Sequence, residues 1–445
     1  MTIEITLLNP ELIQTGLLIN GKWINTNRDL FPVFNPATSE EICKISIATE
    51  DDLLSTVNSA QLAMKEWQKY TAKERGKIIK TWGELITINA DDLAKILTLE
   101  QGKPLTEAKG EILYGASYFE WYAEEAKRIY GETIPANQPK QKITVQYEPV
   151  GVCAAITPWN FPNAMLARKI APAIAAGCAM IAKPASQTPL SANALAYLGL
   201  KAGIPAGLLN VIHGHSGQIG EFFCSNPAIR KLTFTGSTEV GVWLYQNCAN
   251  TMKKMSLELG GNAPLIVFED ADIDIAVEGI IKSKFRNSGQ TCVCSNRIFI
   301  HNSIKNTVIE KLRIEIAKLK QLLKPGGKIL LQTITISDDL FKSYAKQSDM
   351  IRTFIFPGGM LPSEGSLGRE LDKCGLKCSE IFRFGKDYAT TLQIWLKQFK
   401  QKLESILRLG FDEEFARMWE FYLAACSAGF ISERINVVQM EIVHA

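Results

Sequence analysis

The sequence predicts an α/β protein with a doubly wound, mostly parallel sheet, and two observations carry this prediction. Short β-rich runs recur between residues 151 and 236, namely "GVCAAIT", "CAMIAK", "LLNVIHG" and "KLTFTG". Helical stretches separate them, among them "NAMLARKIAPAIAAG" and "SANALAYLGLKAG". Strands that alternate with helices build a parallel sheet covered on both faces. Ligands bind at the carboxyl ends of such strands, so the loops after them are candidate sites.

The segments before this alternation predict other elements. Residues 18–48 alternate apolar and polar side chains around "NG" and "NPATSE", which favours short strands and hairpins. Apolar residues then recur at steps of three or four, at Ile112, Ala116, Phe119, Ala123, Ala126 and Ile129. This spacing predicts one long amphipathic helix, whose stripe needs no role beyond packing. "KITVQYEP", at residues 142–149, indicates an exposed or edge strand.

Composition narrows the class of protein. At roughly 100–200 residues per domain, 445 residues predict two or three domains. A net charge of +3 is too small to indicate a nucleic-acid or anionic-membrane surface. No apolar run reaches the ~18 residues of a membrane span, and "MTIEITLLNPELIQ" lacks the features of a signal peptide. We therefore expect a cytoplasmic protein whose ten cysteines are reduced.

The sequence favours no metal site. "HGH", at residues 213–215, has no cysteine or carboxylate cluster near it in the sequence, so we expect ordinary loop residues there. "FRNSGQTCVCSNR", at residues 285–297, holds two cysteines one residue apart. A zinc site needs about four ligands, and no second pair has suitable spacing.

Two loops after predicted strands can hold a nucleotide, although the chain lacks a G-x-G-x-x-G fingerprint. In "FTGSTEVG", Gly236 and Ser237 open a helix, whose free N–H groups attract a pyrophosphate. The same residues also suit a plain turn and N-cap. In "AKPASQTPL", Lys183 can contact a ribose, and the neutral Ser186 leaves room for a 2′-phosphate. The neutral side chain favours NADP, with NAD as the alternative. The loop can also be an ordinary strand-to-helix connection that binds no ligand.

Four separated motifs now stand in order along the chain: "TPWNFP" (157–162), "FTGSTEVG" (234–241), "LELGGNAP" (257–264) and "GQTCVC" (289–294). Together they resemble the aldehyde dehydrogenase superfamily. "KPASQTPLSA", "KFRNSGQTCVCSNR" and "SLELGGNAP" look most like its succinate-semialdehyde dehydrogenase branch. The resemblance runs from about residue 18 to about residue 320, and it implies NAD(P)-dependent oxidation of an aldehyde through a cysteine thioester.

The resemblance also implies the role of each motif residue. Cys292 matches the nucleophile that attacks the aldehyde carbonyl, and Glu258 matches the general base that activates the hydrolytic water. Asn160 matches the amide that donates to the oxyanion. The residues that the resemblance carries over to the cofactor are Trp159, Lys183, Ser186, Gly236, Ser237 and Leu259.

Three further residues have two readings each. Cys294 can be a redox partner of Cys292 or a small buried packing residue, and we favour packing because free cysteine is commonly buried. Arg168 in "MLARK" and Arg286 in "KFRNSG" match arginines that grip the distal carboxylate of succinic semialdehyde in the resembling branch. The arginine fork suits a carboxylate, but each can also be a surface arginine.

The tail carries a second resemblance. From about residue 321, "QLLKPGGKILLQTITISDDL", "IFPGGMLP" and "FGKDYATTLQIWLKQF" resemble the C-terminal part of cyclopropane-fatty-acyl-phospholipid synthases. These are S-adenosylmethionine-dependent transferases that act on lipid chains. Tyr388 matches a tyrosine of their bicarbonate site, and Gln332 lies near the same site. Their glycine-rich cofactor loop would lie upstream, where this sequence is dehydrogenase-like. The tail is thus expected to be a partial methyltransferase-like α/β fragment.

The dehydrogenase part is also expected to be truncated. The family's catalytic domain continues past the nucleophile with a Glu-Ile-Phe-Gly-Pro motif and a C-terminal strand used for homo-oligomerisation. "EIFRFG", at residues 380–385, lacks Gly-Pro and its surroundings match the other family. We therefore expect that strand to be missing here.

Three domains and three functions follow. We expect a dinucleotide-binding domain over residues 1–257, a truncated catalytic domain over 258–320, and the synthase-like fragment over 321–445. "IAKLKQL", at residues 316–322, indicates one uninterrupted helix through the junction, without the linker typical of a domain fusion. The favoured function is oxidation of a small aldehyde, most of all succinic semialdehyde. The alternatives are lipid methyl or methylene transfer and a non-catalytic chimeric product with exposed apolar faces.

Overall fold

The computed structural model describes residues 5–25, 29–356, 359–408 and 410–445, with the backbone alone described for residues 316–322. The chain forms two compact units. The first comprises Met1–Phe268 and Glu278–Ile300, and the second comprises Glu269–Val277 and His301–Ala445. These units follow spatial contacts, whereas the expected boundaries at residues 257 and 320 follow motifs and remain predictions.

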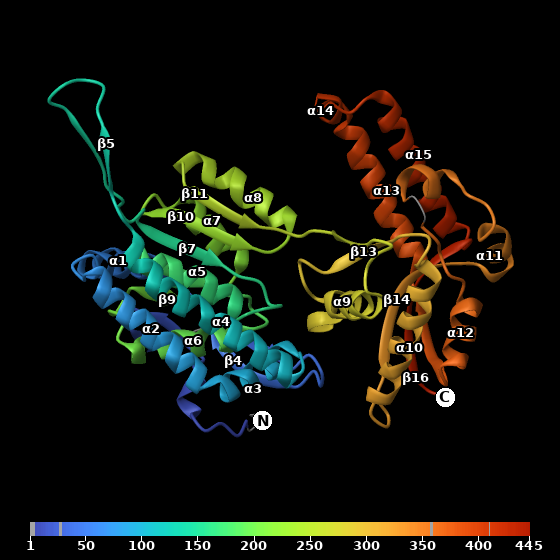
Figure 1. Ribbon diagram of the computed structural model, residues 1–445, viewed down its shortest axis with the longest axis horizontal. Coiled ribbons are helices and arrows are strands. Elements are labelled where there is room, and N and C mark those ends of the chain that lie inside the picture. The colour runs from blue at the N-terminus through green and yellow to red at the C-terminus, as the bar shows by residue number, and fades with distance from the viewer. Residues whose placement is uncertain (1–4, 26–28, 357–358, 409) are drawn as a thin grey trace. The chain divides into compact units, whose positions relative to one another are not determined.

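A seven-stranded sheet organises the first unit, in the order β11-β10-β7-β8-β9-β1-β2. The pairs from β11 to β9 are all parallel, and only β1 and β2 join in the antiparallel sense. The predicted doubly wound, mostly parallel α/β fold is therefore confirmed (Figure 1). The strands are β1 (Leu17–Ile19), β2 (Lys22–Ile24), β7 (Val152–Ile156), β8 (Met180–Lys183), β9 (Leu209–Val211), β10 (Ile229–Thr235) and β11 (Lys254–Glu258).

In the described part of the first unit, eight α-helices accompany this sheet, and local sequence explains where several begin. Thr49 and Thr71 accept the backbone N–H three residues on, in capping boxes that open α1 and α2. The predicted long helix is α4, continued by a 3-10 turn at Ala126–Arg128. The helices are α1 (Glu50–Trp67), α2 (Ala72–Ile88), α3 (Ala90–Gln101), α4 (Leu105–Glu125), α5 (Ala164–Ala175), α6 (Pro189–Ala202), α7 (Ser216–Ser225) and α8 (Thr238–Cys248).

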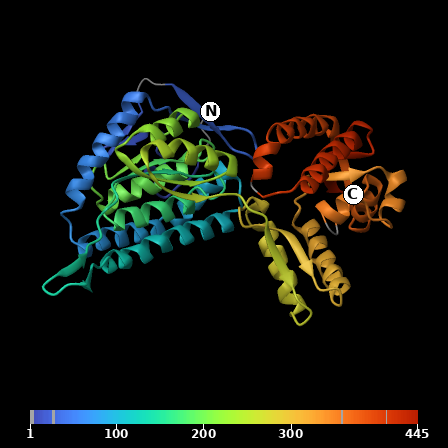
Figure 2. The same cartoon turned by 90° about the horizontal axis from the view of Figure 1, so that it is seen from above.

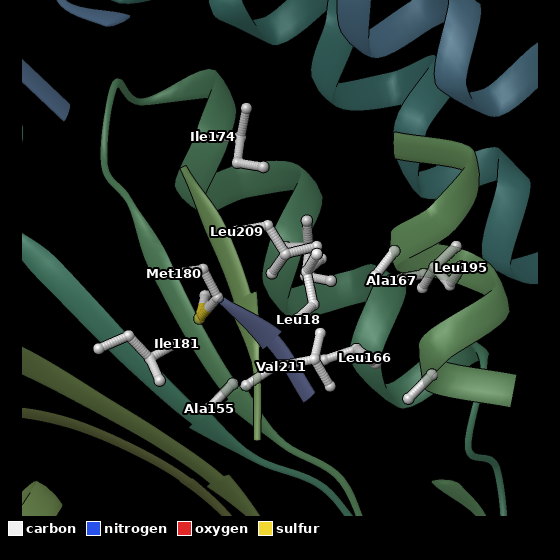
Figure 3. Packing of buried hydrophobic residues seen from close by; sticks show 14 of the residues in the cluster. Leu18, Ala155, Leu166, Ala167, Ile174, Met180, Ile181, Leu195, Leu209 and Val211 are labelled. Atoms are coloured by element: carbon white, nitrogen blue, oxygen red, sulfur yellow. The ribbon is translucent and has the colours of Figure 1, made fainter. Parts of the chain in front are cut away.

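One hydrophobic core joins the sheet to these helices. Met180 and Leu209, which pair in register, lie on one face of the sheet near Leu166 and Ile174 of α5, and Ile181 points to the opposite face (Figure 3). All of them are buried, and each fully buried side chain of this size contributes about 1.5–3 kcal/mol to folding. The positions that bear the site's loops are therefore rigidly supported.

Two hairpins and a small parallel pair complete the first unit. The hairpins are β3 (Leu30–Phe34) with β4 (Glu41–Ser46), and β5 (Glu132–Pro135) with β6 (Lys142–Val145). The second hairpin confirms the exposed strand expected after residue 141, and it projects from its unit in both views (Figure 1, Figure 2). β12 (Ala263–Val267) pairs with β13 (Ser295–Ile300), and α9 (Ile273–Phe285) lies between them in the chain.

The second unit is an α/β fragment, as predicted for the tail. Helix α10 (Lys305–Leu322) runs through the expected junction, and the turn closed by the Gly327 N–H and the Lys324 carbonyl oxygen, 2.8 Å apart, leads into β14. Its antiparallel sheet has the order β14-β16-β15. The elements are β14 (Ile329–Ile336), α11 (Asp338–Tyr344), α12 (Glu364–Lys373), β15 (Leu376–Arg383), α13 (Gly385–Gln401), α14 (Leu403–Arg408), α15 (Glu413–Ile431) and β16 (Ile435–His444).

The packing of α6 on α2 predicts opposite effects for two Gly→Ala substitutions. A Cβ at Gly199 would lie 2.5 Å from Cζ2 of the buried Trp82, whereas a Cβ at Gly110 of α4 would have no atom of a described residue within 4 Å. Overpacking costs about 1–3 kcal/mol, and alanine is favoured over glycine in a helix by up to about 1 kcal/mol. Gly199→Ala should lower the free energy of unfolding measured in urea, and Gly110→Ala should raise it. A stabilised Gly199→Ala variant would contradict this packing.

Candidate active site

The three predicted catalytic residues meet in one pocket at the carboxyl edge of the sheet. Asn160 follows β7, Glu258 is the last residue of β11, and Cys292 lies in the loop before β13. The pocket has a volume of about 280 Å³ and also contains Gly236 and Ser237, which follow β10. Because β11, β10 and β7 are neighbours with parallel registers, their ends present these loops side by side (Figure 1).

The Asn160 side chain faces the loop that carries the candidate nucleophile. Its Nδ2 donates to the Gln290 carbonyl oxygen at 2.8 Å, two residues before Cys292. Its Oδ1 is buried and has no hydrogen-bond partner among the described residues. The Asn160 backbone carbonyl accepts from Lys103 Nζ and from Asn287 Nδ2, each at 2.9 Å. Hydrogen bonds to the Asn160 side chain and to its backbone carbonyl thus both hold this residue against the loop that precedes Cys292.

The loop before Cys292 has an unusual backbone. Asn287 (φ 54°), Ser288 (φ 54°) and Gly289 (φ 76°) lie successively in the left-handed region. Glycine adopts this region freely and asparagine tolerates it, whereas serine is strained there. Such strain persists only where surrounding contacts hold the conformation. The Cys292 side chain is exposed at the end of this turn, where a ligand can reach it.

Glu258 has an unexpected neighbour. Its carboxylate lies 3.6 Å from Arg168 Nη2, and its side chain is 60% exposed. Exposed ion pairs of this kind contribute about 0–1 kcal/mol, so the contact can exchange readily. The structure therefore places Arg168, expected at a substrate carboxylate, beside the candidate base, and that expected role remains a prediction.

The predicted cofactor residues fall into two groups. Trp159, Gly236 and Ser237 line the pocket, where the Ser237 hydroxyl accepts the Val240 N–H at 3.4 Å as the N-cap of α8. A Cβ at Gly236 would overlap the Phe234 ring, so the turn requires glycine. Leu259 packs against α8, where it leaves no room for a Cβ at Gly241. The turn-and-cap arrangement is present, and pyrophosphate binding there remains a prediction.

Lys183 and Ser186 lie outside this pocket, at the end of the next strand, β8. Lys183 is buried and donates to the Pro184 carbonyl oxygen at 3.3 Å. Burial lowers the pKa of Lys183 to about 8. Ser186 is half-buried in the following turn. His213 of "HGH" is buried near Lys183, and burial, followed by that lysine, lowers the pKa of His213 to about 3. Its loop position was predicted, and its burial was not.

The remaining candidates are held by local contacts. The Arg286 guanidinium lies 5.3 Å from the centre of the Phe161 ring. Cys294 is buried, and its thiol donates to the Lys284 carbonyl oxygen at 2.9 Å. This is the position of a packed side chain, although its redox role stays untested. In the second unit, Gln332 accepts from Gln439 at 2.8 Å.

Tyr388 lies on α13, where its ring centre is 5.2 Å from that of Phe430. Its expected bicarbonate role remains a prediction.

Sequence reasoning missed two polar groups beside the pocket. Lys169 is buried on α5 and donates to Thr233 Oγ1 at 2.9 Å, in a cavity of about 330 Å³ that Glu258 also lines. Burial, followed by Arg168, lowers the pKa of Lys169 to about 8. The second group is Lys103, which precedes α4, with Glu107 and Glu111, whose spacing of four puts them on one face of that helix. That spacing was visible in the sequence, but its partners, more than 50 residues away, were not.

Among the described residues, no group of three or more His, Cys, Asp and Glu side chains is arranged to hold a metal ion. The same part of the chain contains no helix with the length and apolar character needed to cross a membrane.

Known families match both parts of the chain. The profile of the aldehyde dehydrogenase family matches residues 23–326, and that of mycolic acid cyclopropane synthetase matches residues 296–440. Both resemblances expected from the motifs are thereby confirmed. The two matches overlap at residues 296–326, so one chain carries parts of two families.

Individual relatives support the first match. Succinate-semialdehyde dehydrogenase (NADP+) of Escherichia coli K12 is 52% identical over 312 residues, which cover 70% of this chain and 65% of that protein. Glutarate-semialdehyde dehydrogenase of Pseudomonas putida is 53% identical and covers 81% of this chain and 75% of its own length. A crystal structure of succinate-semialdehyde dehydrogenase from Burkholderia pseudomallei has a TM-score of 0.69 and 51% identity, and covers 71% and 66% of the two chains. The chain thus spans about two thirds of such relatives.

The buried Lys169 predicts a dependence of stability on pH. An unfolded lysine keeps its proton up to a pH of about 10.4, whereas the folded protein releases the Lys169 proton near pH 8. Between these values the unfolded chain binds more protons, so the free energy of unfolding rises with pH. In Lys169→Met this rise should be shallower by up to about 1.4 kcal/mol per pH unit.

Urea unfolding of parent and variant from about pH 8 to about pH 10.4 measures this difference. Lys80→Met, which alters an exposed lysine of α2, is the matched control and should keep the parent slope. Equal slopes for Lys169→Met and the parent would show that the amine is solvated in the folded protein.

Proposed function

Because this chain belongs to the aldehyde dehydrogenase family, we propose that it oxidises an aldehyde to a carboxylic acid, with NADP as the hydride acceptor and NAD as the alternative. The observation that carries this proposal is the meeting of Cys292, Glu258 and Asn160 in one pocket. They come from three separate segments, and each has the chemistry that one step of the reaction requires.

The pocket's own groups fit a dinucleotide. Thr235 Oγ1, at the end of β10, is buried without a hydrogen-bond partner among the described residues, so a polar group is free for a ligand there. The N-terminus of α8 offers backbone N–H groups and a positive dipole end. Gly236, Ser237 and Trp159 would hold the dinucleotide near this helix, and Lys183 and Ser186 its ribose. When bound, NADP supplies the acceptor for hydride.

The reaction then follows from the side chains. The Cys292 thiolate bonds to the carbonyl carbon, and the resulting oxyanion accepts hydrogen bonds from the Asn160 amide and the Cys292 N–H. Loss of hydride leaves a thioester on Cys292. Glu258 takes a proton from water, whose oxygen attacks the thioester and releases the carboxylic acid and the thiolate. The amide must turn from the Gln290 carbonyl to meet the oxyanion, as apo sites commonly require.

We propose an aldehyde with a distal anionic group as substrate, with succinic semialdehyde as the favoured example. Relatives are named for succinate semialdehyde, glutarate semialdehyde and 3-sulfolactaldehyde, which share an anionic group away from the aldehyde. Arg168 and Arg286 supply positive charge near the pocket. A carboxylate that pairs with Arg168 would also free Glu258 from its ion pair, which couples substrate binding to release of the base.

A second candidate function rests on the match at residues 296–440. Transfer from S-adenosylmethionine needs a cofactor loop that the resemblance puts upstream of this match, where the chain is dehydrogenase-like. A non-catalytic product is the third candidate. We favour aldehyde oxidation, and we expect slow turnover because the chain spans only 65% of the Escherichia coli relative.

The first test is a burst of NADPH absorbance after mixing the protein with NADP and succinic semialdehyde. We expect a burst of at most one NADPH per chain, because thioester formation precedes hydrolysis. Cys292→Ala should abolish it by removing the nucleophile, and Cys294→Ala should keep it. A burst from Cys292→Ala would exclude the thioester route, and its absence from folded parent protein would favour the non-catalytic candidate.

The cofactor preference is tested at Ser186. In Ser186→Glu a carboxylate would stand where we place the 2′-phosphate, and like charges in partly buried sites repel by several kcal/mol. NADPH binding, followed by fluorescence titration, should weaken at least about tenfold while NADH binding does not. Gln187→Glu adds the same charge at the exposed neighbour and is the control. Equal weakening of both cofactors would separate Ser186 from the 2′-position.

A further inference from the structure

Three charged side chains from one short segment contact both loops of the candidate active site. Lys103 precedes α4, and Glu107 and Glu111 lie on its first two turns. The spacing of four residues puts Glu107 and Glu111 on one face of α4. Lys103 and Glu111 reach the loop of Asn160, and Glu107 reaches the loop of Cys292.

Lys103 and Glu111 form a buried ion pair beneath the Asn160 loop. Each side chain is 1% exposed, and Lys103 Nζ donates to a Glu111 carboxylate oxygen. The same ammonium group donates to the Asn160 carbonyl oxygen at 2.9 Å and lies 4.1 Å from the centre of the Phe161 ring. Its hydrogen bonds and its charge are therefore directed at the residue whose amide we assign to the oxyanion and at the residue that follows it.

Glu111 holds the other end of this loop. Its Oε1 accepts the backbone N–H groups of Asn163 and Ala164, at 3.0 and 3.1 Å, where α5 begins. A carboxylate at a helix N-terminus satisfies otherwise unpaired donors and meets the positive end of the dipole. The four residues from Asn160 to Asn163 are thus fixed at both ends by one ion pair.

Glu107 extends the contact to the nucleophile loop. Its Oε2 accepts the Asn287 N–H at 2.7 Å, at the first left-handed residue. The Asn287 amide then donates to the Asn160 carbonyl oxygen at 2.9 Å and to the Gln290 carbonyl oxygen at 3.0 Å. The Asn160 carbonyl is therefore a shared acceptor, which receives one donor from Lys103 and one from the loop that Glu107 holds.

We infer that Lys103, Glu107 and Glu111 are positioning residues that fix the Asn160 amide relative to Cys292. The inference rests on the proposed function, because it assigns the oxyanion to that amide. A buried ion pair is weak evidence for stability, since desolvation offsets its attraction and an apolar pair commonly replaces it without loss. The hydrogen bonds that Lys103 and Glu111 direct at the Asn160 loop explain why charged residues are kept at these two positions. A misplacement of about 1 Å can lower a rate about 10²-fold.

The test measures two reactions of Cys292 that need no cofactor. With p-nitrophenyl acetate the thiolate bonds to the acyl carbon and the C–O bond breaks, releasing p-nitrophenolate, so the oxyanion site is used. With iodoacetamide the thiolate displaces iodide at a saturated carbon, and no oxyanion forms. Pre-steady-state absorbance and mass spectrometry give the two rates, and Cys292→Ala gives the background.

The double variant Lys103→Met/Glu111→Leu replaces the ion pair by apolar side chains, and Glu107→Ala removes an exposed acceptor. In both we expect acylation to slow about 10²-fold, alkylation to change less than about threefold, and thermal unfolding of Glu107→Ala to match the parent. Glu107→Gln keeps an acceptor oxygen and should recover most of the rate. Lys109→Met removes an exposed ion pair with Asp91, 2.6 Å long, and is the control.

Parent-like acylation in both variants, or an equal fall of acylation and alkylation, overturns the inference. It is also overturned if the parent is acylated no faster than Cys292→Ala. If the double variant fails to fold, Glu107→Ala decides alone. Normal acylation with no NADPH burst would remove the proposed function and leave the positioning role in place, so the two failures are distinguishable.

Discussion

The candidate site depends on the parallel register of three neighbouring strands. Thr235 of β10 pairs with Glu258 of β11, and Phe234 pairs with Ile156 of β7, so the three strands end within one residue of each other. A slip of one residue in β11 would turn the Glu258 side chain to the opposite face of the sheet. The loops after β7 and β10 would keep their positions, but the candidate site would lack the general base Glu258. The buried side chains that set this register therefore determine the chemistry as much as the polar ones do.

Much of this arrangement was predictable because its signals are local. Strands β7 to β10 appear as short apolar runs, and the residues after them carry the motifs. The rule that ligands bind at carboxyl ends then brings Asn160, Gly236 and Glu258 together. What could not be predicted depends on partners far apart in the chain. The Arg168–Glu258 contact spans 90 residues, and the bond from Asn287 to Glu107 spans 180.

Some of the buried charged side chains lie beside the loops and strands of the candidate site, and others lie in α1 and α3. Lys103, Glu111, Lys169 and Lys183 are all buried, and desolvation is the largest influence on the pKa of each. Glu100 is similar, since burial raises its pKa to about 8 while it accepts the N–H groups of Leu190 and Ser191 at the start of α6. Apolar residues at such positions would avoid the desolvation penalty of a buried charge. The charges therefore indicate that the ends of these loops and helices need fixed polar partners.

The left-handed turn at residues 287–289 has a consequence for how this sequence can change. A glycine at position 288 would relieve the strain of the serine, but it would also widen the conformational range of the unfolded and folded loop alike. A β-branched residue there would be excluded by its side chain. Drift at this position is therefore confined to a few small or amide-bearing residues. Selection for stability favours a residue at position 288 that relieves the strained backbone, whereas selection for a precisely positioned Cys292 thiol favours a residue that restricts the loop. The two requirements therefore select different residues.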